Sequence, residues 1–133
     1  MSKLYKINLK CAKLYRGDSL RIYTEYRLGI LFIRISGRLA KDTVKKMNNK
    51  VALVISNTGI RKVVVNVERL SKIDYKGINS LLYIYEITKR NKGQVFICGI
   101  NVKIEQLLKR SHLFNYVNLI PNELCALQVL KGW

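Results

Sequence analysis

The sequence is poor in the residues on which catalytic and metal sites depend. It holds one histidine, His112, and eight acidic residues among 133. A paired-carboxylate site would therefore need two of those eight to meet in the fold. The chain contains no GxGxxG or Walker phosphate loop, no GxSxG nucleophile elbow and no HExxH zinc motif. These absences argue against an enzyme, and we expect no catalytic residue, metal site or cofactor.

Long apolar runs and paired cysteines are also missing. No run reaches the roughly 18–20 apolar residues that a membrane-spanning helix needs, and the start of the chain does not resemble a secretory signal. Three cysteines, Cys11, Cys98 and Cys125, lie far apart in the sequence. Cys98 and Cys125 occur in apolar segments, which is typical of free thiols in a reducing compartment. We therefore expect a cytoplasmic protein without a transmembrane segment.

Positive charge is the most unusual feature of the composition. Lysine and arginine number 25 against eight acidic residues, which gives a formal net charge of +17. Such an excess favours nucleic acid, anionic lipid or an acidic protein as partner. The basic residues are nevertheless scattered, with only short clusters such as Lys45-Lys46 and Lys89-Arg90. A scattered excess is equally typical of a solvated surface, so both interpretations stay open.

The pattern of apolar residues predicts one α/β domain over residues 19–133, preceded by a basic lead-in over residues 1–18 whose structure the pattern does not define. Two apolar runs, 20–26 and 30–35, flank the turn signal Arg27-Leu28-Gly29 and predict a hairpin that Ser36-Gly37 ends. A helix capped by Asp42 or Thr43 is expected to end at Gly59.

The rest of the chain alternates strands and helices. We expect a strand over 62–67, a polar loop over 68–76, a helix over about 77–91, a strand over 94–99, a helix capped by Asn101, an edge strand over 116–120 and a final helix opened by Pro121-Asn122. This order builds a mixed, mostly parallel sheet flanked by helices, with an N-terminal hairpin or extra strand.

Several segments in this order carry a family resemblance. The second strand closes as Gly37-Arg38-Leu39, a G-x-L ending, and residues 63–82 read VVVNVERLSKIDYKGINSLL. Residues 107–114 (LLKRSHLF) are similar to an L-x-x-S-G-L pattern. From about Tyr26 to Leu130 the chain therefore resembles the STAS-domain family and, within it, the anti-sigma factor antagonists of the sporulation type.

The resemblance implies a protein that switches between partners. In these relatives a D-S-S/T-G turn opens a helix, and an anti-sigma kinase phosphorylates the hydroxyl directly after the Asp. A phosphate at that point lies beside unpaired backbone N–H groups and the positive helix end. Its charge and bulk then disturb the partner interface.

This sequence departs from the pattern at the acceptor itself. Asp74 and Gly77 are kept, but Tyr75-Lys76 stands between them. The phenol of Tyr75 reaches several ångströms further from the backbone than a seryl oxygen, and Lys76 adds positive charge. Arg38 and Ala40 also replace acidic residues that are common around the G-x-L. Candidate substitute acceptors are Tyr75, Ser71 and Ser80, each of which also has an ordinary structural interpretation.

The prediction is a non-catalytic protein-binding module that docks an anti-sigma factor kinase or a related ATPase. The residues expected to form its binding surface are Arg38, Asp42, Thr43, Asp74, Tyr75, Lys76, Gly77 and Ile78. Two alternatives remain. One is a nucleic-acid-associated protein that reuses the fold, with Lys3, Lys6, Lys10, Lys13 and Arg16 in its lead-in. The other is a regulatory STAS subunit of a membrane transporter.

Overall fold

A six-stranded sheet forms the centre of the protein. The computed structural model describes residues 12–131. The strands lie in chain order across the sheet: β1 (Ala12–Arg16), β2 (Leu20–Arg27), β3 (Ile30–Leu39), β4 (Lys62–Ile73), β5 (Gln94–Cys98) and β6 (Asn118–Leu119). The first three strands pair antiparallel, and β3 to β6 pair parallel. The predicted mixed α/β fold is confirmed.

The predicted hairpin is present, and a further strand precedes it. Leu28 and Gly29 join β2 to β3 with φ values of 53° and 81°, as a tight turn between twisted strands requires. Strand β1 lies in the lead-in and pairs with β2, with a bulge between Lys13 and Tyr15. Cys11 and the three lysines Lys3, Lys6 and Lys10 lie outside the described residues.

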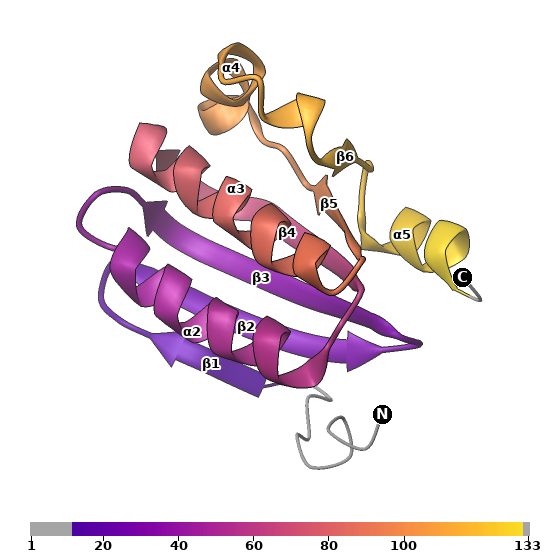
Figure 1. Ribbon diagram of the computed structural model, residues 1–133. Helices are drawn as coiled ribbons and strands as arrows, with labels where there is room; N and C mark the ends of the chain where they lie inside the picture. The colour runs from indigo at the N-terminus through magenta and orange to yellow at the C-terminus, as the bar shows by residue number, and fades with distance from the viewer. Residues whose placement is uncertain (1–11, 132–133) are drawn as a thin grey trace.

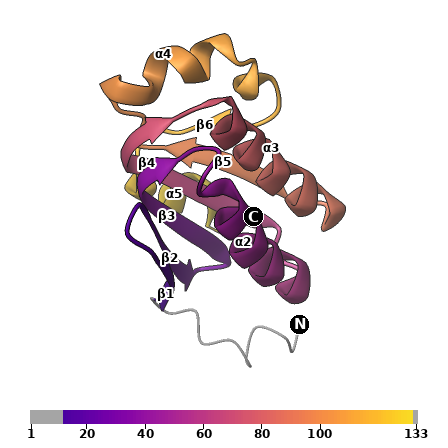
Figure 2. The same ribbon diagram turned by 90° about the vertical axis from the view of Figure 1, so that its left-hand side faces the viewer.

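Helices cover the two faces of the sheet unequally (Figures 1 and 2). On one face lie α2 (Val44–Thr58), α3 (Tyr75–Arg90) and α4 (Val102–Arg110), followed by the short 3₁₀ helix η1 (Leu113–Asn115). Their buried residues share one large apolar cluster with the strands. On the other face α5 (Glu123–Leu130) covers a smaller cluster that includes Phe32, Phe96 and Cys98.

The helix termini form largely as the sequence predicts. Asn101 and Asn122 accept hydrogen bonds from the first-turn amides of α4 and α5, as N-cap residues do. Gly59 ends α2 in the left-handed conformation with φ of 69°. Thr43 precedes α2, but its hydroxyl contacts the backbone of Arg38 and Ala40 and not the amides of the helix.

Two strands are longer than predicted, and this corrects the interpretation of residues 68–76 as a loop. Strand β3 passes through Ser36-Gly37 to Leu39, and β4 runs on to Ile73, so that α3 begins at Tyr75. The two extensions pair with each other across two register shifts. These shifts place buried residues of β4 three apart, at Val67, Leu70 and Ile73, which hides the two-residue period of an ordinary strand.

Gly37 allows β3 to continue through one of these irregularities. Its φ is 96°, and a Cβ atom there would lie 2.3 Å from the carbonyl oxygen of Ser19. No other residue fits both the conformation and the space. The glycine that seemed to end the strand is therefore what lets it bend and reach the loop before α2.

Candidate docking surface at the start of α3

The ends of β3 and β4 bring the two predicted binding segments together. Leu39 and Ile73 are register partners at the last position of the parallel pair, and the Asp74 amide donates to the Leu39 carbonyl at 3.4 Å. The chain then leaves β3 toward α2 and β4 toward α3. We call residues 37–43 and 71–78 the junction.

Asp74 holds the two halves of the junction together. One carboxylate oxygen accepts a hydrogen bond from the Gly77 amide at 2.9 Å and so caps α3. The other accepts from the Lys41 amide at 3.0 Å. An acidic N-cap residue also interacts favourably with the positive end of the helix. Both oxygens thus bind backbone groups of this chain.

The second acidic residue of the junction also has an internal partner. Asp42 forms an ion pair with the Arg38 guanidinium, and the hydrogen bond from Arg38 lowers the pKa of the Asp42 carboxyl. Arg38 also lies 3.4 Å from the Ser19 hydroxyl. Arg38 and Asp42 therefore interact with each other at the surface as well as with solvent.

Three of the eight predicted residues are buried within the junction. Thr43, Gly77 and Ile78 are buried. A Cβ at Gly77 would lie 2.2 Å from the Leu39 carbonyl oxygen and 2.6 Å from Ile73, so glycine lets α3 approach the end of β3. These residues set the position of α3, while Tyr75 and Lys76 face solvent.

The three candidate acceptors differ in access. Tyr75 is the first residue of α3 and is 62% exposed. Ser71 is exposed on β4, and its hydroxyl donates to the Gly37 carbonyl at 2.9 Å. Ser80 is 1% exposed, and its hydroxyl lies 2.5 Å from the Asn48 side-chain oxygen. A kinase could reach Ser80 only if α2 and α3 separated.

The free charges of the junction are positive. Lys41, Lys72 and Lys76 are exposed, and none forms an ion pair within residues 12–131. The two acidic residues, Asp42 and Asp74, already bind groups of this chain, as described above. No sequence motif indicates Lys41 or Lys72. The loop predicted over residues 68–76 contains Lys72, which instead lies on β4 as the register partner of Arg38.

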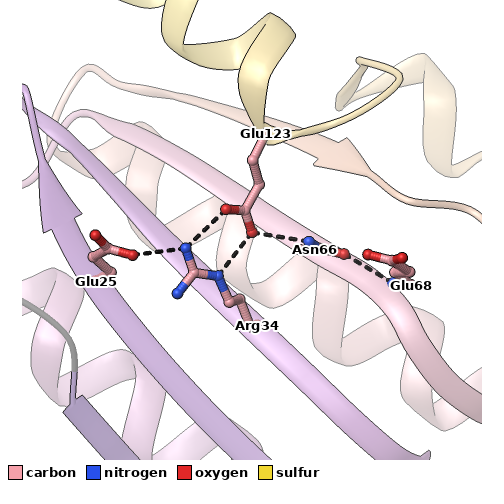
Figure 3. A network of polar contacts seen from close by, with 5 residues as sticks. All are labelled: Glu25, Arg34, Asn66, Glu68 and Glu123. Atoms are coloured by element: carbon pink, nitrogen blue, oxygen red, sulfur yellow. Dashed lines mark hydrogen bonds and ion pairs between the residues drawn. The ribbon is translucent and has the colours of Figure 1, made fainter.

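A second polar cluster lies on the face that α5 covers (Figure 3). The Arg34 guanidinium contacts both oxygens of Glu123 at 2.8 and 2.9 Å and Glu25 at 2.7 Å. Asn66 donates to Glu123 at 2.8 Å. Hydrogen bonding to Arg34 lowers the pKa of Glu123. No sequence motif indicates this cluster, because Arg34 and Glu123 are 89 residues apart.

The described residues offer no metal site: among residues 12–131 no three histidine, cysteine or acidic side chains are grouped to hold an ion. Cys98 and Cys125 are free thiols. In the same part of the chain no helix combines the length and apolar character needed to cross a membrane.

Comparison with known proteins identifies the class that this fold represents. Residues 21–124 match the STAS domain, and the chain belongs to the STAS-domain family. Within the family it is similar to anti-sigma factor antagonists. It is 26% identical over 113 residues to the anti-sigma F factor antagonist of Paenibacillus polymyxa, a match that covers 85% of this chain and 97% of that protein.

Solved structures share the fold. The anti-sigma factor antagonist SpoIIAA in its unphosphorylated form superposes with a TM-score of 0.66 at 18% identity, over 84% of this chain and 99% of that one. An anti-sigma factor antagonist from Mycobacterium paratuberculosis superposes with a TM-score of 0.76 at 17% identity, over 90% of this chain and all of that one.

Proposed function

We propose that the protein is a non-catalytic binding module that docks an anti-sigma factor kinase or a related ATPase through the junction. The observation that carries this proposal is the α3 N-terminus, which Asp74 caps and which presents Tyr75 and Lys76 to solvent. It occupies the place of the D-S-S/T-G turn that the family resemblance implies. The likeness to anti-sigma factor antagonists supports the same assignment.

The chemistry of the junction supports a changed mode of regulation. The hydroxyl that a serine kinase would modify is replaced by the phenol of Tyr75. Ser80 is buried, so Ser71 and Tyr75 are the accessible substitutes. In this proposal neither substitute restores the switch, so docking does not depend on phosphorylation and ATP does not release the partner.

The charge of the junction supports an acidic partner. Lys41, Lys72 and Lys76 face solvent without ion pairs among the described residues. The carboxylates of Asp42 and Asp74, in contrast, are bound by groups of this chain. Complementary potentials speed association and discriminate between partners. The docking surface of the partner is therefore expected to carry aspartate and glutamate, and the complex to weaken as salt rises.

The test compares partner affinity across substitutions at Tyr75. The kinase-type protein that co-purifies from the native cell is purified, and its affinity is measured for the wild type, Tyr75→Ser and Tyr75→Glu. Tyr75→Ser should fold normally and bind, since a hydroxyl residue suits the first turn of a helix. Tyr75→Glu should weaken binding by roughly a few kcal/mol, because it places like charges together across a desolvated interface.

A matched control is available on the same face of the sheet. Tyr116 is also an exposed tyrosine, at 54%, and lies after η1, far along the chain from the junction. Tyr116→Glu should bind as the wild type does. Equal affinities for the wild type, Tyr75→Ser and Tyr75→Glu would show that the partner docks elsewhere. Release of the wild type by ATP would refute the proposed loss of the switch.

A further inference from the structure

Three arginines lie in one row across the sheet. Arg16 on β1 is the register partner of Arg21 on β2, Arg21 is the partner of Ser36 on β3, and Ser36 is the partner of Arg69 on β4. Neighbouring strands are about 4.8 Å apart, and register partners project from the same face. The row therefore spans four strands, with one hydroxyl between two guanidinium groups.

The row lies between two hollows of the surface. The first, about 300 Å³, is lined in part by Tyr23, Arg34 and Asn66. The second, about 330 Å³, is lined in part by Ser19 and Gly37. Arg21, Ser36 and Arg69 line both hollows. The face is the one that α5 covers further along, so helix α5 leaves this part of the sheet open.

The arginines of the row differ from their neighbour Arg34 in having no carboxylate partner. Arg34 is paired with Glu25 and Glu123. Arg16, Arg21 and Arg69 are exposed, and none lies within 4.0 Å of an acidic oxygen of residues 12–131. Like charges directly opposite each other on a sheet are destabilising, so an anion that bridges them would relieve the repulsion.

We propose that this arginine row binds a small phosphorylated molecule through its phosphate groups. Arginine presents a planar fork of donors that matches phosphate oxygens two at a time. Arg21 and Arg69 would contact the phosphate groups from either side, and the Ser36 hydroxyl would donate between them. The guanidinium of Arg16 extends the site toward β1. The proposal is independent of docking at the junction.

The surroundings favour a small ligand over nucleic acid. Each hollow matches the lower end of the range for small-molecule sites, about 300–1,000 Å³. Asp18 lines the second hollow and Glu68 the first. An extended polyanion that continued beyond the row would meet these carboxylates, whereas a compact di- or triphosphate group would lie between them.

Calorimetric titration with inorganic pyrophosphate tests the site, with inorganic phosphate as a weaker probe. Pyrophosphate is expected to bind the wild type with 1:1 stoichiometry at physiological ionic strength. Arg21→Gln and Arg69→Gln should each weaken it at least tenfold, and Ser36→Ala to a smaller extent. Arg90→Gln, which removes the same charge from the end of α3, should leave the affinity unchanged. Circular dichroism confirms that each variant folds.

Three results would overturn the proposal. Failure of the wild type to bind pyrophosphate would show that the row is not a phosphate site. Equal weakening by Arg90→Gln would show attraction to net charge alone. Duplex DNA that binds more tightly than pyrophosphate, and does so through Arg21 and Arg69, would identify nucleic acid as the occupant.

Discussion

Replacing Glu123 by glutamine should loosen α5 from the sheet. Glu123 is the first residue of α5 and accepts two hydrogen bonds from Arg34 on β3 and one from Asn66 on β4. The Arg34 and Glu123 side chains are 33% and 22% exposed. A hydrogen bond to a charged group contributes about 1.5–3 kcal/mol, and we expect Glu123→Gln to lower the free energy of unfolding by about that much.

Cys98 reports the loosening directly. It is buried beneath α5 in the smaller apolar cluster, and burial raises the pKa of its thiol to about 12. In a background with Cys11→Ser and Cys125→Ser, the rate at which a thiol reagent labels Cys98 measures the opening of α5. Because 1.4 kcal/mol corresponds to a factor of ten, Glu123→Gln should speed labelling roughly ten- to hundredfold.

Two control substitutions separate the loss of the Glu123 contacts from general effects of removing a carboxylate. Glu105 pairs with Lys109 on the surface of α4 at 3.1 Å, and Glu105→Gln should cost under about 1 kcal/mol, as exposed pairs do. Glu68, like Glu123, raises the pKa of Cys98 by its charge, but it lies on β4 and not on α5. Glu68→Gln should therefore speed labelling only through the lower pKa of the thiol, and by much less than Glu123→Gln. Unchanged stability and unchanged labelling in Glu123→Gln would refute the reasoning.

The same substitution has a defined pH dependence. The folded-state pKa of Glu123 is lowered, first by hydrogen bonding to Arg34. Its contribution to stability is therefore present above the ordinary value of 4.5 and is lost as pH falls from there through the folded-state pKa. Denaturant unfolding at several pH values should show the wild type and Glu123→Gln converging under acid conditions. A constant difference would contradict this assignment.

Two further predictions concern the junction and the net charge. Gly77→Ala should destabilise the protein by about 1–3 kcal/mol, the range for overpacking, since its Cβ would meet the Leu39 carbonyl; denaturant unfolding measures this, and a loss under 0.5 kcal/mol would contradict it. Duplex DNA should bind weakly and release above physiological salt; tight binding that survives such salt and is lost on deleting residues 1–18 would instead favour the nucleic-acid alternative.

The sequence predicted the features that depend on nearby residues. The turn at Leu28-Gly29, the left-handed end of α2 at Gly59 and the caps Asn101 and Asn122 each follow from residues within a few positions. The alternation of strands and helices follows from the period of apolar residues. Together these determine the fold class.

The features that the sequence did not predict depend on register or on distant pairing. The end of β4 was interpreted as a loop because its buried residues recur every three positions. The row containing Arg21 and Arg69 exists only because β3 and β4 shift register before Ser36. The contact of Arg34 with Glu123 needs α5 to fold back over the sheet. None of these features produces a pattern among neighbouring residues of the sequence.

The two hydrogen bonds of Asp74 bear on the thermodynamics of association. Because one carboxylate joins the Lys41 amide to the Gly77 amide, the segments before α2 and α3 are already ordered in the free protein. Loops that are mobile before binding lose conformational entropy when a partner immobilises them, which reduces affinity. In this protein the segments before α2 and α3 lose that conformational entropy during folding, before a partner binds. Asp74 thus acts as a preorganising residue, and losing its carboxylate would weaken a complex by the entropy cost of ordering these segments, in addition to any contact that Asp74 makes with the partner.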